Sequence, residues 1–87
     1  MKKIKKDYTK VLEKCISIAK IRQKDYGEAT QSIRLANDIL KNTFGVEMSD
    51  KAFCQVIIAL KLSREKVNHK DDNIKDCINY LAIMLSL

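Results

Sequence analysis

Two glycines, Gly27 and Gly45, are the only ones in this 87-residue chain, and proline is absent. Between and around these two positions, apolar residues recur every three or four positions, which is the period of an α-helix. A chain without proline and with few glycines can sustain long helices, and it lacks the residues that tight hairpin turns require. The sequence therefore predicts an all-α fold.

The two glycines divide the first half of the chain into two helices. The first begins near Ile4, presents one apolar face, and runs to Tyr26. Glycine readily takes the left-handed conformation that follows a helix end, so Gly27 is expected to stop this helix in that way. The second helix occupies residues 28–44 and ends at Gly45 for the same reason.

The second half of the chain holds two more helices. Ser49 is the predicted N-cap of the third helix, because its hydroxyl can accept a hydrogen bond from the first turn. Residues 67–70 form a short polar connection, after which Asp71 or Asp72 is expected to cap the fourth helix. Four helices with short connections form a compact antiparallel bundle or a pair of helical hairpins, here a single domain spanning residues 1–87.

The last segment, residues 81–87, is apolar on more than one side. A helix that is apolar most of the way round must be covered on both sides. A chain of this length buries only about 60–65% of its unfolded surface, so one chain alone offers little cover. We therefore expect a homo-oligomer, a dimer at least.

Composition excludes two classes of protein. With 46% hydrophobic and 32% charged residues, the chain is neither a disordered tail nor a membrane protein. Its apolar runs, such as residues 56–60, fall far short of the roughly 20 residues that a membrane span needs. Residues 1–6 are basic and no apolar stretch follows them, so we expect no secretory signal and a cytoplasmic location, in the host cytoplasm if the protein is viral.

Three cysteines, Cys15, Cys54 and Cys77, each fall on an apolar helical face. They form no CxxC pair, and the chain has one histidine, so the spacing fits no standard zinc module. The sequence predicts buried, reduced thiols.

Positive charge is concentrated at the start of the chain. The net charge is +6, and residues 1–24 hold nine basic residues against Asp7 and Glu13. A basic first helix suggests an anionic partner, although such charge also serves solubility. The chain has no zinc finger, no tryptophan and no helix-turn-helix spacing, so we do not expect a nucleic-acid polymer as partner.

Several polar residues continue apolar faces. Lys61 follows Ile57 by four positions and Arg64 follows Leu60 by four, so both are predicted on the buried face of the third helix. Arg22 extends the apolar line of the first helix. The fourth helix carries three polar residues at a spacing of four: Asp72, Asp76 and Tyr80.

Two interpretations of these residues remain open. In the first, Lys61 and Arg64 pair with Asp72 and Asp76 in a salt-bridge cluster across the last helical hairpin. In the second, the cluster lines a pocket, where Arg22 and the two hairpin cations meet phosphates and the carboxylates hold a metal or a sugar hydroxyl.

The ordered set of Arg22, Tyr26, Gly27, Lys61, Arg64, Asp72, Asp76 and Tyr80 resembles a known pattern. It is similar to the small, often phage-encoded branch of the MazG-like all-α NTP pyrophosphohydrolase superfamily, over about residues 10–85. The resemblance implies a four-helix MazG-like bundle, assembled as a dimer or tetramer, with a nucleotide bound between helices.

Catalytic members of that superfamily hold Mg²⁺ through an E-x-x-E pair and an E-x-x-D pair. Here Asn73 stands three residues before Asp76, and no E-x-x-E occurs. Fewer acidic ligands and a positive net charge favour binding an anion over hydrolysing it. The leading hypothesis is a non-catalytic nucleotide-binding protein that needs no cofactor. If viral, it would be a sponge for host immune signalling nucleotides, cyclic ones included.

The resemblance also implies roles for individual residues. Arg22, Lys61 and Arg64 would bind phosphates. Tyr26 or Tyr80 would stack on a base, and Asp72 or Asp76 would bind a ribose or base edge.

The alternative is a Mg²⁺-dependent nucleoside triphosphate pyrophosphohydrolase with metal ligands Asp72 and Asp76. Glu28 and Asp38 could converge with them in the folded oligomer. A third class is a structural or regulatory protein whose basic first helix docks on an acidic protein.

Overall fold

The structure is a computed structural model and describes residues 7–87. These residues form four α-helices and no strand: α1 (Tyr8–Tyr26), α2 (Ala29–Phe44), α3 (Asp50–Val67) and α4 (Asp71–Ser86). The all-α prediction is confirmed. Ile4, the expected start of the first helix, and the lysines at positions 2, 3, 5 and 6 lie outside the described residues.

Two helices begin at side-chain caps. At the start of α1, Asp7 Oδ1 accepts a hydrogen bond of 2.9 Å from the Thr9 backbone N–H. At the start of α3, Ser49 Oγ accepts one of 3.1 Å from the Ala52 backbone N–H, which confirms the predicted cap. Each bond satisfies a backbone donor that has no partner within the helix.

The start of α4 differs from the prediction. Lys70 is the N-cap, and it makes no side-chain capping bond. Asp71 and Asp72 lie in the first turn instead, where negative charge favours the helix dipole. The predicted aspartate cap is therefore wrong, because Glu65 of α3 supplies the acceptor, as described below.

The two glycines end helices in different conformations. Gly45 is left-handed, with φ 69° and ψ 19°, and its N–H donates to the Lys41 carbonyl at 2.9 Å. Gly27 also ends its helix and donates to the Gln23 carbonyl at 2.8 Å, but its φ of 82° and ψ of −166° lie outside the left-handed helical region. That extended region with positive φ is open essentially to glycine alone.

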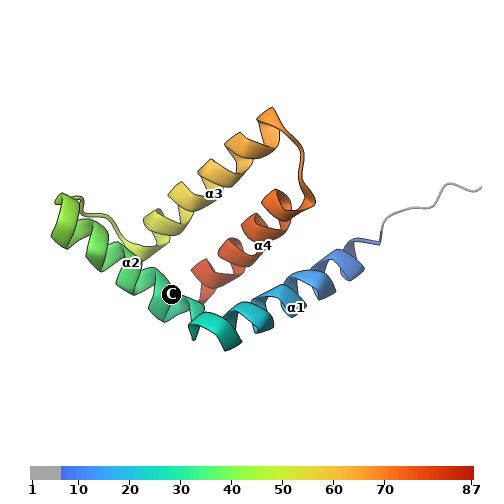
Figure 1. Cartoon of the computed structure of the whole chain (residues 1–87), viewed down its shortest axis with the longest axis horizontal. Helices are drawn as coiled ribbons and strands as arrows, with labels where there is room; N and C mark the ends of the chain where they lie inside the picture. Colours follow the sequence, from blue (N-terminus) through green and yellow to red (C-terminus); the bar gives the residue numbers. More distant parts are fainter. Residues whose placement is uncertain (1–6) are drawn as a thin grey trace, which may run out of the picture.

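Helix α4 contacts each of the other three helices (Figure 1). Its most extensive contacts are with α3, which lies beside it and runs in the opposite direction. Helix α1 packs along α4 as well, and α2 contacts α1, α3 and α4. Helix α4 therefore links the other three helices.

Most of the buried apolar residues are cysteines. Cys15, Cys54, Cys77 and Ile33 are the buried apolar residues of the described part, and all three cysteines are free. Burial raises the pKa of the Cys54 and Cys77 thiols, so both stay protonated at neutral pH. The prediction of buried, reduced thiols is confirmed.

A single chain leaves much apolar surface exposed. Leu81 and Leu85 of α4 are 53% and 91% exposed, and Ile16 and Ile21 of α1 are 55% and 61% exposed. Within residues 7–87, none of the helices combines the length and apolarity that a membrane crossing requires.

Candidate functional site

Asp76 joins three helices through its carboxylate. The residue lies on α4 and is only 6% exposed. Its Oδ1 is 3.1 Å from Nη2 of Arg22 on α1, and its Oδ2 is 2.8 Å from Nζ of Lys61 on α3. Both oxygens of this buried acid are thus paired with cations, which offsets the cost of removing the charge from water.

The two cations differ in exposure. The Lys61 side chain is 22% exposed, whereas the Arg22 side chain is 50% exposed. Two positive groups share one carboxylate, so the three side chains carry a net charge of +1. The solvent-facing part of this excess charge lies on Arg22.

Arg22 also lines a cavity of about 720 Å³ between α1, α2 and α4. Tyr26 lines the same cavity from the end of α1, and Tyr80 lines it from α4. The start of α2, including Glu28 and Ser32, forms a further wall. The cavity thus brings together three residues of the predicted nucleotide set that are up to 58 positions apart in the sequence.

Asn79 is a cavity residue that sequence reasoning missed. It lines the cavity beside Tyr80, and its Nδ2 is buried without a hydrogen-bond partner among residues 7–87. An unpaired buried donor is costly, so such groups usually have a ligand or water partner. An asparagine within the apolar stretch of the fourth helix was the available signal.

Arg64 and Asp72 do not join this site. Both are exposed, and within residues 7–87 neither makes an ion pair. The prediction that Arg64 continues the buried face of α3 is wrong. The buried side of that helix runs instead through Cys54, Lys61 and Glu65, and Arg64 precedes Glu65 by one residue, a rotation of about 100°.

The predicted salt-bridge cluster forms only in part. Lys61 pairs with Asp76 as proposed, but the second cation on that carboxylate is Arg22 and not Arg64. The link therefore ties α1 to the α3–α4 hairpin, which local spacing within the hairpin did not indicate.

Glu28 and Asp38 do not meet in the single chain. Glu28 lines the same cavity as Arg22, while Asp38 lines a separate cavity of about 410 Å³. Among residues 7–87, no group of three or more histidine, cysteine, aspartate or glutamate side chains is placed to hold a metal ion.

Comparison with known protein families places the chain in one of them. Residues 10–87 match DUF6378, described as a domain of unknown function. The chain belongs to the DUF6378 family. No curated protein and no solved structure matches it significantly. The DUF6378 match includes all of α2, α3 and α4, and with them the cavity and the Asp76 ion pairs.

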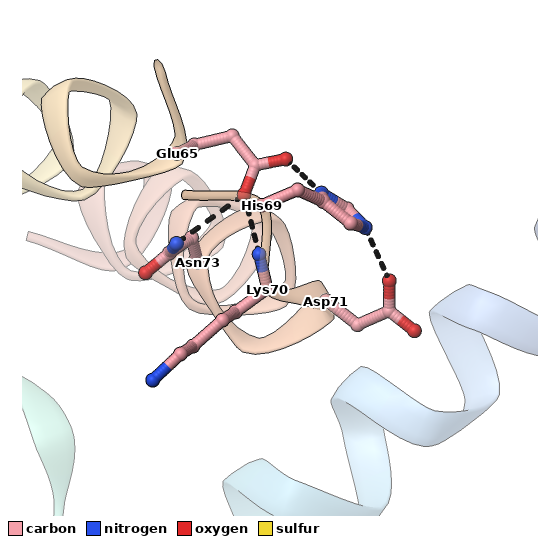
Figure 2. A network of polar contacts seen from close by, with 5 residues as sticks. All are labelled: Glu65, His69, Lys70, Asp71 and Asn73. Atoms are coloured by element: carbon pink, nitrogen blue, oxygen red, sulfur yellow. Dashed lines mark hydrogen bonds and ion pairs between the residues drawn. The ribbon is translucent and has the colours of Figure 1, made fainter. Parts of the chain in front are cut away.

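This DUF6378 chain has a second polar network at the α3–α4 connection (Figure 2). Glu65 Oε1 accepts hydrogen bonds from the Lys70 backbone N–H at 2.9 Å and from Asn73 Nδ2 at 3.2 Å. Its Oε2 contacts His69 Nδ1, and His69 Nε2 lies 3.0 Å from Asp71 Oδ1. The hydrogen bond with His69 lowers the pKa of Glu65, and the same bond raises the pKa of His69.

Proposed function

We propose that this DUF6378 domain binds a nucleotide in the cavity between α1, α2 and α4, without hydrolysing it. The observation that carries the proposal is the meeting of Arg22, Tyr26 and Tyr80 at one cavity. A guanidinium fork suits phosphate oxygens, and a tyrosine ring offers a face on which a base can stack. The volume of about 720 Å³ lies within the range of small-molecule sites.

The ionic state of Asp76 supports binding without turnover. Mg²⁺ that bridges phosphates needs carboxylate oxygens with free lone pairs directed at the ion. Both Asp76 oxygens are engaged by cations, and among residues 7–87 no group of three or more histidine, cysteine, aspartate or glutamate side chains is placed to hold an ion. The acidic residues of one chain therefore do not fit a Mg²⁺ site, and the pyrophosphohydrolase alternative requires acids from another subunit.

The test incubates purified protein with a panel of nucleotides, with and without Mg²⁺. The panel contains dNTPs, NTPs, cyclic di- and trinucleotides and ADP-ribose, and each filtrate is analysed by HPLC before and after heat denaturation of the protein. We expect one nucleotide to leave the filtrate and to return intact on heating. Conversion of a triphosphate to a monophosphate only with Mg²⁺ would show hydrolysis instead, and an unchanged filtrate for every compound would contradict binding.

A matched pair of arginine variants tests the place of binding. Arg22→Gln removes the cation at the cavity, and Arg34→Gln removes one on α2 that lies outside the cavity and is similarly exposed. We expect the first variant to weaken nucleotide binding by about tenfold or more, which is the usual effect of losing a charged hydrogen bond. The second variant is expected to bind as the unaltered protein does.

We also propose that the chain assembles as a homo-oligomer, a dimer at least. The support is the apolar surface that one chain leaves exposed, which includes Leu81 and Leu85 of α4 at 53% and 91% exposure. A dimer interface that covers such side chains buries about 800 Å² on each partner. Sedimentation equilibrium is expected to give a multiple of 10.0 kDa. A single 10.0 kDa species at all concentrations would contradict this.

A further inference from the structure

We infer that Asp76 is a positioning residue, which holds Arg22 at the edge of the cavity and does not itself contact the bound molecule. The inference rests on the proposed nucleotide site and gives a role to Asp76, the buried acid next to it. It also differs from the roles that the sequence suggested for Asp76, which were contact with a ribose, a base edge or a metal.

The first support is the geometry of the carboxylate. Asp76 is 6% exposed, and its two oxygens lie 3.1 Å from Arg22 and 2.8 Å from Lys61. A carboxylate this buried, with a cation on each oxygen, offers a ligand group little access. The cavity lining includes Arg22 but neither Lys61 nor Asp76. The acid therefore acts behind the cation that meets the cavity.

The second support is the unused bonding capacity of Arg22. Its ion pair with Asp76 joins Nη2 to Oδ1, whereas a guanidinium has five N–H donors in a fixed planar arrangement. A long side chain on a helix surface samples many rotamers unless a partner selects one. Asp76 selects one for Arg22, and donors remain available for a phosphate oxygen.

Lys61 completes the arrangement from the third helix. With Lys61 on its other oxygen, the carboxylate is shared and the three groups keep a net charge of +1. Glu28, which also lines the cavity, adds one negative charge. Asp76 thus orders Arg22 while its own charge is shared with Lys61.

The competing relation is one in which Asp76 and an anionic ligand bind the same guanidinium in turn. The two relations predict opposite changes in anion affinity when the charge of Asp76 is removed. If Asp76 positions Arg22, removing its charge weakens anion binding. If Asp76 competes with the ligand, removing its charge strengthens anion binding.

The experiment measures the binding of ATP and of inorganic pyrophosphate by calorimetry. For Asp76→Asn we expect the affinity to fall by about fivefold or more, the coupling typical of side chains in direct contact. The matched control is Asp71→Asn, which removes the same charge from the first turn of the same helix. It is expected to bind within about twofold of the unaltered protein, because an exposed charge at that end is screened by solvent.

A double-mutant cycle separates positioning from a general structural role. If Asp76 acts through Arg22, Asp76→Asn has no further effect on affinity in a chain that already carries Arg22→Gln. An equal additional loss in that chain, an unchanged affinity for Asp76→Asn alone, or a stronger affinity would each overturn the inference.

A second readout does not depend on any ligand. The chain has three arginines, Arg22, Arg34 and Arg64, so their side-chain N–H signals can be assigned by NMR. We expect Asp76→Asn to accelerate hydrogen exchange at Arg22 and to leave the other two unchanged. If the unaltered protein binds no compound of the panel, the proposed function fails, and an unchanged Arg22 signal would then overturn the positioning role separately.

Should Asp76→Asn fail to fold, Asp76→Glu replaces it in both measurements. This variant keeps the negative charge and moves the carboxylate by one methylene group. We expect the same direction of change in ATP affinity and in Arg22 exchange, and no change in either would contradict the inference.

Discussion

At the scale of single residues, Glu65 supplies the hydrogen-bond acceptor that the N-cap of α4 lacks. Lys70, the N-cap, has no side chain that can accept a hydrogen bond, yet its own backbone N–H is bound by Glu65 at 2.9 Å. The same carboxylate oxygen accepts from the Asn73 side chain within the first turn of α4. A carboxylate at this position also interacts favourably with the helix dipole. One residue near the end of α3 thus fixes the beginning of the next helix.

This network makes stability depend on pH through His69. Its pKa is raised above 6.5, so its contribution is fully present below pH 6.5 and is lost as the pH rises through the raised value. The pKa of Glu65 is lowered below 4.5, so that contribution is present above pH 4.5 and is lost as the pH falls through the lowered value. Both contributions are present together between these limits.

We therefore expect His69→Gln to be most destabilising at about pH 5.5 and less so at about pH 8.5, because the imidazole of the unaltered protein loses its proton as the pH rises through its raised pKa. The free energy of unfolding, measured with urea at both pH values, checks this. Lys66→Gln is the control, since Lys66 is exposed and makes no ion pair within residues 7–87. A destabilisation by His69→Gln that is equal at both pH values would refute the expectation.

At the scale of elements, the two glycines set how one helix follows another. Gly45 has the left-handed conformation that asparagine also tolerates, whereas Gly27 has a conformation open essentially to glycine. A Cβ added at either position meets no atom within 4 Å. Any cost of substitution therefore comes from the backbone and not from a clash.

This difference predicts a ranking of variants. Gly27→Ala is expected to lower the free energy of unfolding by about 1–3 kcal/mol, the cost of holding a non-glycine residue in that region. Gly45→Asn is expected to cost only a few tenths of a kcal/mol, and Gly27→Asn is expected to cost as much as the alanine variant. Urea denaturation of the three variants gives the ranking. Equal losses at Gly27 and Gly45 would contradict it.

The sequence predicted the positions of the helices well, but it predicted much less well which face of each helix is buried. Periodicity and the two glycines predicted four helices, and the second begins at Ala29, one residue after the expected start. On α3, however, Leu60 is exposed and its neighbour Lys61 is largely buried. Adjacent residues differ by about 100° around a helix, so packing against α4 decided between two neighbouring faces that both carry apolar residues.

The sequence singled out several residues of the candidate site but did not predict which of them form ion pairs. Arg22, Tyr26 and Tyr80 were identified, and the cavity brings them together. The pairing of Arg22 with Asp76 joins residues 54 positions apart, and no local spacing encodes such a contact. Arg64 was misplaced because the helical face was taken from the apolar line through Leu60.

At the scale of the whole molecule, the exposed apolar surface predicts that stability depends on protein concentration. Association stabilises the folded chain by mass action, so the melting temperature of an oligomer rises with concentration. We expect a higher Tm at high protein concentration than after strong dilution, measured by circular dichroism under one buffer condition. A Tm independent of concentration would indicate a monomer, whose Leu81 and Leu85 face water.

The buried cysteines allow local opening of the helices to be followed by thiol labelling. Cys15 lies on α1 and contacts the Lys75 carbonyl of α4, whereas Cys54 lies on α3. A thiol reagent reaches a buried cysteine only when the surrounding structure opens, so the labelling rate of each reports a different opening event. A molecule bound between α1, α2 and α4 would slow the labelling of Cys15 selectively. The chain can therefore report occupancy of its cavity without any engineered probe.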